Sequence, residues 1–491
     1  MDSYDALPYD SIPIPETHPE QIAAMAALFG VRAAAPDRCR VLELGAASGG
    51  NLIPLAFYFP HGLFVGIERS PVQARAGQAL IERLALRNIE LRVADILDFV
   101  WTEEPFDYIV AHGVYSWAPQ AVREKLLEIA SRHLAPDGIA YISYNTLPGW
   151  RLRGMLRDAL RHAVDGAATP VEQLARARGQ LEMMAAAFTG MDAPSAKHLA
   201  AEIARLRARP DSYLYHEYLE AINEPLLFSE FAALARRHGL EYLTDASPEW
   251  LVPDALPEPA AALLRAIADP LEREQQLDFL ISRAFRRSLL VRAGRAKTRE
   301  AQFESLGTLA FYSSARPRKD LRLHRPQRIA FALPDGEQIE VEHPLTKAAL
   351  AHLAEVYPDS VAFMDLAQIA QRAVIAAGGQ RHAEQQDHFF GEMAGMFLHR
   401  VALATPLVRA WPRATGAKPR VNALARAQAD SGAAHLITPR HGAFPVGARE
   451  RRMISCMDGE HGIADIARAA GIARVDTEKF VAALASQVLI N

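Results

Sequence analysis

Three carboxylates stand at or near the ends of apolar runs in the first hundred residues. Glu43 lies in "VLEL", Glu68 ends "LFVGIE" and Asp95 ends "IELRVAD". Each run is typical of a buried strand, and the carboxyl ends of parallel strands meet at one edge of a sheet, where ligands bind. A carboxylate at the end of the second strand accepts both hydroxyls of a ribose. The spacing therefore predicts a nucleoside site, with Asp95 placed to accept an adenine amino group; the alternative is that all three carboxylates cap helices.

A glycine-rich segment, "GAASGGN", follows Glu43 and precedes the helical run "LIPLAFYF". It departs from the dinucleotide pattern G-x-G-x-x-G, because Ala47 and Gly49 stand second and fourth after Gly45. Glu43 would also repel a pyrophosphate, whereas it suits a cationic group such as the amino end of S-adenosylmethionine. We therefore expect that cofactor, held by residues at the strand ends: Glu43, Gly45, Ala47, Gly49, Asn51, Glu68, Arg69, Asp95, Ile96, His112 and Gly113.

Other chemistries find little support in the same stretch. A nucleophile elbow around Ser48 would lack the first glycine of G-x-S-x-G. The sequence has no P-loop and no Cys/His cluster with zinc spacing, so no metal site is expected.

The fourth strand ends in "FDYIVAHGVYSWAP", which puts polar aromatics where an ordinary turn would suffice. Methyl transfer from a sulfonium needs in-line alignment beside an electron-rich wall, and aromatic faces stabilise positive charge. We expect Tyr115 to offer its hydroxyl to the acceptor and Trp117 to offer its face. His112 and Gly113 are expected to contact the cofactor through their backbone. The alternative for Trp117 is a core or lid ring.

Three further segments are expected at the same mouth. The fifth strand ends in "SYNTLPGW", and the Pro-rich "ALPYDSIPIPETHPE" is too apolar for a free tail and should fold over the cofactor. The segment "YLYHEYLE" contributes His216 and Glu217. His216 is expected to act as a base or proton carrier, with a structural role as an equal alternative. The residues expected to face the substrate are Tyr9, His18, Tyr144, Asn145 and Trp150.

The order of strand and helix signals predicts the elements that position these residues. Five strands alternate with helices over residues 1–145, which implies a doubly wound, Rossmann-like parallel α/β sheet. Residues 151–210 are helical throughout, and the strand-like "LEYLTDA" then returns to the sheet. We therefore expect a cofactor-binding domain in 1–150 plus 211–250, interrupted by a helical insert in 151–210.

The second half of the chain has a different pattern. Beyond a Pro-rich joint, apolar residues alternate on both sides of Asp335-Gly336, a strong hairpin signal, and two helical runs follow. We expect α+β winged-helix-like modules: a middle, regulatory domain in 251–400 and a C-terminal module in 401–491. The basic "RAFRRSLLVRAGR" is interpreted as an amphipathic helix that is solvated or contacts another domain.

The composition narrows the function classes. A net charge of −4 gives no reason to expect nucleic acid or an anionic membrane as partner. The start "MDSYDALPYD" is unlike a signal peptide, and no run of about 18 apolar residues occurs. With only Cys39 and Cys456 in the sequence, two free thiols are the simpler interpretation, so we expect a cytoplasmic protein.

These motifs together resemble a known family. The segments "VLELGAASGGNLIPLA", "AHGVYSWAP", "SYNTLPGWRLRGMLRD", "YLYHEYLEAINEPLLFSEFA" and "LPDGEQIEVEHPLTKAALAHL" are similar to class I S-adenosylmethionine-dependent methyltransferases that carry a methyltransferase regulatory domain. That group includes the rickettsial protein-lysine methyltransferases acting on outer-membrane proteins. The resemblance covers most of the chain and is weakest from about Arg409 to Gly447.

The resemblance implies a methyltransferase acting on a protein, with lysine amines as acceptors. It also implies an insert often used for dimerisation, so we expect a homodimer through 151–210. The C-terminal modules are expected to position the protein substrate, and the resemblance points to an outer-membrane or surface protein before its export. Two alternatives stay open: a small-molecule or natural-product methyltransferase, and a regulatory protein that binds the cofactor without turnover.

Overall fold

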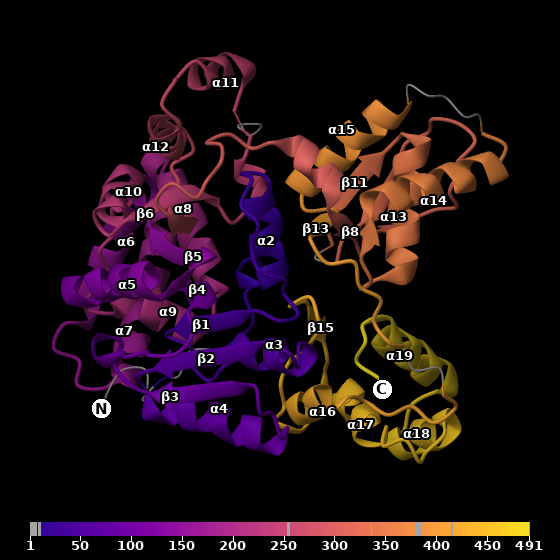
Figure 1. Ribbon diagram of the computed structural model, residues 1–491. Helices are drawn as coiled ribbons and strands as arrows, with labels where there is room; N and C mark the ends of the chain where they lie inside the picture. Colours follow the sequence, from indigo (N-terminus) through magenta and orange to yellow (C-terminus); the bar gives the residue numbers. More distant parts are fainter. Residues whose placement is uncertain are drawn as a thin grey trace.

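The computed structural model describes residues 7, 11–252, 256–334, 336–379, 385–413 and 416–490. Its centre is a seven-stranded sheet in the order β3-β2-β1-β4-β5-β7-β6 (Figure 1). The strands are β1 (Arg40–Leu44), β2 (Leu63–Glu68), β3 (Ile89–Val93), β4 (Phe106–Ala111), β5 (Leu134–Asn145), β6 (Leu240–Asp245) and β7 (Phe285–Arg292). The first five are parallel, which confirms the doubly wound fold.

The last two strands are antiparallel to their neighbours. The predicted return to the sheet is confirmed in β6, which pairs with β7, and β7 pairs with β5. The prediction of a helix for "RAFRRSLLVRAGR" is wrong, because this segment forms β7. Its arginines are accommodated by pairing: Arg286 is fully buried and donates to Asp278 and to Glu274.

Helices cover both faces of the sheet. Neighbouring residues on one strand belong to different hydrophobic clusters, Val41 to one and Leu42 to the other, because successive side chains on a strand point to opposite faces. One face is covered by α2 (Pro19–Ala27), α3 (Leu52–Tyr58) and α4 (Pro71–Arg83), and the other by α5 (Gln120–His133) and α10 (Phe228–Arg237).

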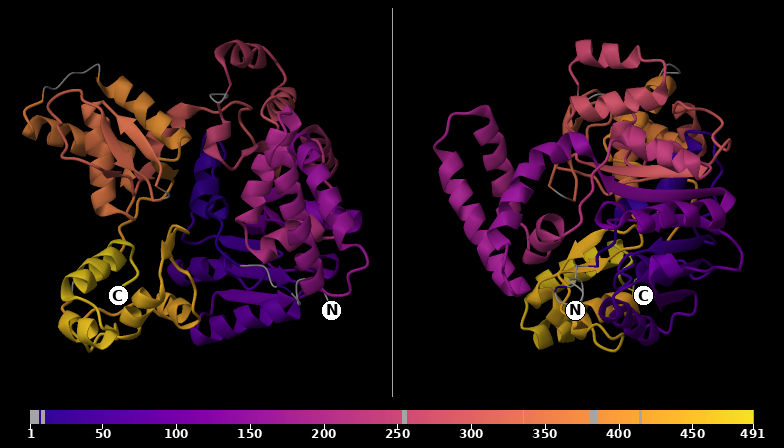
Figure 2. Two further views of the ribbon diagram at one scale, coloured as in Figure 1. Left: turned by 180° about the vertical axis from the view of Figure 1, so that it is seen from behind. Right: turned by 90° about the vertical axis from the view of Figure 1, so that its left-hand side faces the viewer.

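The segment between β5 and α10 is helical. It contains α6 (Leu147–Val164), α7 (Pro170–Thr189), α8 (Pro194–Arg207), α9 (Asp211–Leu214) and a π-helical turn at Tyr215–Leu219. Helices α6 to α8 share a small hydrophobic cluster of their own and stand to one side of the sheet (Figure 2). The model thus has helices where the insert is expected.

The second half of the chain forms smaller units. After α11 (Glu258–Arg265) and α12 (Pro270–Leu280), one small sheet joins β8 (Ala310–Tyr312), β12 (Val361–Ala362) and β13 (Leu403–Thr405). A second joins β9 (Arg316–Pro317), β10 (Ile329–Ala332) and β11 (Gln338–Val341). The helices of this region are α13 (Pro344–Val356), α14 (Phe363–Ala376) and α15 (Gln385–Leu398). Strands β10 and β11 pair antiparallel, which confirms the predicted hairpin; Asp335 of its turn lies outside the described residues.

The C-terminal module contains α16 (Ala423–Asp430), β14 (His435–Ile437), β15 (Ala443–Pro445), α17 (Ala448–Ser455), α18 (Ile463–Ala470) and α19 (Arg474–Ser486). It has its own hydrophobic cluster and lies beside α3, where Tyr58 donates to the carbonyl oxygen of Ile437 (Figure 1). Among the described helices, none is long and apolar enough to cross a membrane.

Candidate active site

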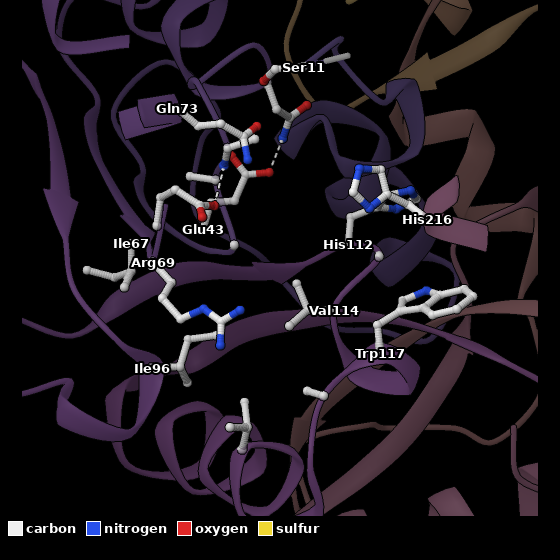
Figure 3. Close-up of a pocket in the computed structure, with 18 of the residues that line it drawn as sticks. Ser11, Glu43, Ile67, Arg69, Gln73, Ile96, His112, Val114, Trp117 and His216 are labelled. Carbon is white, nitrogen blue, oxygen red and sulfur yellow. Dashed lines mark hydrogen bonds between the residues drawn. The ribbon is translucent and has the colours of Figure 1, made fainter. Parts of the chain in front are cut away.

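A cavity of about 390 Å³ opens at the carboxyl edge of the sheet. Its walls come from the ends of β1, β2 and β4, from the loop after β3, from the start of antiparallel β7, from the π-helical turn and from the N-terminal segment. Figure 3 shows Arg69 and Ile96 at one end of the cavity, with His112, His216 and Trp117 at the other. The residues predicted to hold the cofactor that line it are Glu43, Gly45, Ala47, Asn51, Glu68, Arg69, Asp95, Ile96, His112 and Gly113.

Glu43 has one oxygen with a partner and one without. Asn51 donates from Nδ2 to Glu43 Oε1 over 3.1 Å, whereas no described residue donates to the buried Oε2. Burial raises the pKa of Glu43 to about 8, and the neighbouring charge of Glu68 adds to this. A buried carboxylate oxygen without a donor is a strong acceptor for an incoming ammonium group. The amino end of S-adenosylmethionine fits this position.

Glu68 is fixed by backbone donors at the end of β2. Its Oε1 accepts from the Ser70 N–H over 2.7 Å and its Oε2 accepts from the Ala47 N–H over 2.9 Å. The second bond holds Ala47 at a φ of +49°, a left-handed conformation that favours glycine. Burial raises the pKa of Glu68. The carboxylate therefore shapes the glycine-rich loop and also faces the cavity.

The glycines of the loop have different roles. Gly45 has a φ of +82°, and a Cβ there would lie 2.5 Å from Val114 Cγ2. Gly49 does not line the cavity; its Cβ would press against Ile53 and Leu91, so it serves close packing. Asp95 both lines the cavity and caps the short helix η2 (Ile96–Asp98), since Oδ1 accepts from the Leu97 N–H over 2.9 Å.

An N-terminal segment, residues 11–14, crosses the loop and is named the strap here. Ser11, Ile12 and Ile14 line the cavity. Gly50 donates its N–H to Ser11 Oγ over 2.9 Å, and the Ile14 N–H donates to Asn51 Oδ1 over 3.1 Å. Asn51 therefore joins the strap to Glu43. Tyr9 lies outside the described residues.

The end of the cavity opposite Arg69 and Ile96 is named the acceptor end here, after the role expected for it (Figure 3). His112, His216 and Trp117 line it, the Phe285 ring lies 5.9 Å from the ring of His112, and Glu217 follows His216 in the π-helical turn. Burial lowers the pKa of His112 to about 4, so its ring is neutral, and Nδ1 pairs with the Tyr141 hydroxyl over 2.9 Å. The Gly113 N–H donates to Ser143 Oγ over 2.9 Å, so the expected backbone contact from that N–H to the cofactor is not supported.

His216 is held at both ring nitrogens. Nδ1 lies 3.0 Å from Glu220 Oε1 and Nε2 lies 2.7 Å from the Leu7 carbonyl oxygen. Both partners are acceptors, which leaves neither nitrogen available to take a proton from a substrate. The placement favours the structural alternative for His216, although its ring borders the cavity.

Besides Gly49, five residues predicted to act on or to face the acceptor do not line the cavity. Tyr115 and Tyr144 are buried against Phe231, with ring centroids 5.3 and 4.1 Å from it. The turn η3 (Tyr115–Trp117) directs Tyr115 into this core, so the prediction that its hydroxyl meets the acceptor is not supported. The others are also buried: Asn145 donates to Asn223, Trp150 packs behind Trp117, and His18 packs between Phe59 and His441.

Several lining residues were missed by the sequence predictions: Ser11, Ile12, Ile14, Gln73, Val114 and Phe285. The strap was expected over the cofactor as a segment, without these positions. Glu217 was expected at the site from the same segment as His216, without a role of its own, and it does line the cavity. Phe285 lies in a segment predicted to be helical, and nothing in its surroundings in the sequence points to a site.

Comparisons with known proteins agree with this geometry. Three family models match: "Methyltransferase domain" at residues 36–182, "Predicted methyltransferase regulatory domain" at 210–292, and "PKMT, C-terminal winged helix domain" at 417–485. The solved structure of PKMT2 from Rickettsia typhi in complex with AdoHcy is 26% identical, covers 98% of this chain and 100% of its own, and superposes with a TM-score of 0.85.

Two uncharacterized proteins of Rickettsia prowazekii (strain Madrid E) are also similar. RP789 is 38% identical over 287 residues, 58% of this chain, and the match spans about half of that protein (52%). RP028 is 32% identical over 241 residues, which are 49% of this chain and 96% of that protein.

The cofactor is S-adenosylmethionine, since the methyltransferase model covers the glycine-rich loop and the Rickettsia typhi structure holds AdoHcy. The carboxylates of the cavity fit it by their own chemistry. The chain belongs to the class I S-adenosylmethionine-dependent methyltransferases of the rickettsial PKMT type, with a regulatory domain and a C-terminal winged helix.

Proposed function

We propose that this methyltransferase transfers methyl groups to lysine side-chain amines of a protein substrate. The observation that carries the proposal is the composition of the acceptor end: the rings of Trp117 and Phe285 together with the carboxyl group of Glu217. Aromatic faces attract a cation by about 0.5–2 kcal/mol each, and a carboxylate adds a charge partner. This lining favours an alkylammonium acceptor over a neutral hydroxyl or a carboxylate.

The remaining lining residues position the cofactor. Glu43 would pair with its amino group, Glu68 with its ribose hydroxyls and Asp95 with its adenine amino group. When bound, the cofactor supplies a methyl group activated on a sulfonium. The protein orients the reactants and excludes water, and alignment of this kind is the main requirement of an in-line displacement.

A protein as the acceptor is supported from outside the cavity. The winged-helix module and the two small sheets add surface beyond what a small-molecule acceptor needs, and the Rickettsia typhi neighbour is named PKMT2. The resemblance to enzymes acting on outer-membrane proteins supports a surface protein methylated in the cytoplasm before export. The homodimer expected through 151–210 belongs to the same proposal.

The test is to incubate a cell lysate with the protein and isotopically labelled S-adenosylmethionine. We expect label in the lysines of one or a few proteins, located by mass spectrometry after digestion. Label confined to small molecules would favour the natural-product alternative. Cofactor binding without transfer to any acceptor would favour the regulatory alternative.

Two variants of aromatic residues test whether methyl transfer takes place in this cavity. Trp117→Ala removes a lining ring and should lower turnover about ten-fold or more, equivalent to about 1.4 kcal/mol, with little change in S-adenosylhomocysteine affinity. Tyr115→Phe, two residues away in the core, is the matched control and should leave turnover within about two-fold. Equal losses in both variants would contradict the assignment of Trp117 to the acceptor end.

A further inference from the structure

Glu217 is a carboxylate at the acceptor end that has no assigned role in cofactor binding. It lies in the π-helical turn Tyr215–Leu219 and lines the cavity next to His216. Figure 3 shows His216 on the same side as Trp117, opposite Arg69 and Ile96. A π-helical turn inserts one extra residue into a helix and occurs frequently at functional sites. This turn brings two successive polar side chains, His216 and Glu217, to one cavity.

No described residue donates a hydrogen bond to the Glu217 carboxylate. Arg153 and Arg205 both pair with Glu202 instead. Arg157 donates to the carbonyl oxygens of Tyr218 and Glu220 over 2.8 and 2.6 Å. These arginines act on Glu217 only through space, so its oxygens remain available to a ligand in the cavity.

His216 cannot take this role. Both of its nitrogens face acceptors, Glu220 Oε1 and the Leu7 carbonyl oxygen. It is therefore committed to holding the turn in place. The neighbouring carboxylate is the one basic group in the described lining that lies at the acceptor end and has no described donor.

We propose that Glu217 accepts the ammonium proton of the acceptor lysine and so generates the neutral amine that attacks the methyl group. This inference rests on the proposed function. One proton moves from the lysine Nζ to a Glu217 carboxylate oxygen; the nitrogen lone pair then forms the N–C bond while the S–C bond breaks and its electron pair returns to sulfur. The product is a methylammonium and a neutral thioether, and Glu217 returns its proton to solvent after release.

The electrostatic surroundings of Glu217 fit this role. Burial raises its pKa to about 7, although Arg153, His216, Arg157 and Arg205 oppose the shift. The charged and titratable groups that face it come from α6, from its own turn, from α8 and, with Tyr213, from α9. A carboxylate that is half ionised near neutral pH both takes up and releases a proton readily.

The test compares Glu217→Gln with the native enzyme over a pH series. The probe is a short peptide with a single central lysine, chosen from the sites labelled in the lysate, and the readouts are kcat, KM and the affinity for S-adenosylhomocysteine. We expect kcat to fall about 100-fold near neutral pH, which is typical of a lost general base, with cofactor affinity within about two-fold.

The shape of the pH profile separates this role from packing. In the native enzyme kcat should rise up to about pH 7 and then level, since Glu217 takes the lysine proton. In Glu217→Gln, kcat should keep rising toward the lysine's own pKa of about 10.4. Glu217→Asp should recover part of the rate. Glu202→Gln, which removes a carboxylate beside the same arginines outside the cavity lining, is the matched control and should keep the native profile.

Each outcome decides a different point. Native enzyme that labels no lysine would overturn the proposed function. Native transfer with an unchanged profile in Glu217→Gln would overturn only the role of Glu217. If Glu217→Gln melts early, the profile of Glu217→Asp decides: a level region above about pH 7 supports the role, and a profile that keeps rising overturns it.

Discussion

At the residue scale, the buried carboxylate of Glu43 makes cofactor binding depend on pH. Burial raises its pKa to about 8, so below pH 8 the free protein holds this group protonated. Binding an ammonium group requires the ionised form, and a proton must leave. The ligand's α-amino group, that of a free amino acid, stays protonated over this pH range. We therefore expect the affinity for S-adenosylhomocysteine to rise about ten-fold per pH unit from pH 6 to 7 and to be greatest near pH 8.

Calorimetry in two buffers of different ionisation enthalpy would measure the released proton directly. The control is Glu43→Gln, which should bind the ligand more weakly and release no proton on the acidic side. An equal proton release in both proteins would show that Glu43 does not pair with the amino group.

How far the sequence predicts single residues depends on the backbone that carries them. The sequence could place three carboxylates, Glu43, Glu68 and Asp95, at the cavity. Each stands at or near the end of a strand, and the ends of parallel strands lie together at one edge of the sheet. The sequence could not tell which of two rings, Tyr115 or Trp117, faces the cavity. Both lie in the three-residue turn η3, and the conformation of that turn decides which ring faces the core. Their predicted roles beyond these positions remain proposals.

At the scale of elements, the sequence again predicts what local patterns determine and misses what depends on distant residues. The five parallel strands could be predicted, since each combines a short apolar run with a following helix. β7 could not, because its three arginines resemble the polar face of a helix. The carboxylates that pair with Arg286, Asp278 and Glu274, come from another element, α12. The π-helical turn was also unpredictable, and it is what brings Glu217 beside His216 in the cavity wall.

The strap yields a prediction at this scale. A Cβ at Gly50 would lie 1.9 Å from the backbone oxygen of Ser11, so Gly50→Ala must displace the strap from the loop. We expect the affinity for S-adenosylhomocysteine to fall about ten-fold, because Ser11 and Ile14 form part of the cavity wall and would move with the strap. Limited proteolysis should cut the variant near its N-terminus faster.

The matched control is Gly154→Ala in α6, where a new Cβ would meet no atom within 4 Å. It should leave affinity unchanged and stabilise the helix by up to about 1 kcal/mol. Native affinity in Gly50→Ala would show that the strap does not complete the cofactor site.

At the scale of the whole molecule, the helical insert leaves apolar surface open. Leu152 and Met155 lie three residues apart on α6 and are about half exposed, 45% and 49%. Residues at this spacing share one helix face, and paired exposed apolar side chains favour a protein partner. We expect a homodimer in sedimentation at micromolar concentration and a monomer for Leu152→Glu with Met155→Glu. A native monomer, or a dimer in the double variant, would contradict the homodimer.

The C-terminal module also contacts the cofactor domain through the segment that follows the strap. Glu20 and Arg440 form an ion pair in which both side chains are buried, and Arg440 also stacks 4.0 Å from the Tyr312 ring. His441 Nδ1 lies 3.4 Å from the carbonyl oxygen of Ile14. The N–H of the same residue, Ile14, donates to Asn51. The strap is therefore contacted on one side by the winged-helix module, through His441, and on the other by Asn51 of the glycine-rich loop.

These contacts give the last prediction. Arg440→Gln leaves the Glu20 charge buried without its partner, and breaking a buried pair in this way costs about 3–5 kcal/mol of folding free energy. Because the pair lies beside the strap, S-adenosylhomocysteine affinity should fall together with the melting temperature. Adding Glu20→Gln removes the stranded charge and should recover most of both losses. If the single variant loses stability but binds the cofactor normally, the module supports the fold without supporting the cofactor site, and the strap is held by the glycine-rich loop alone.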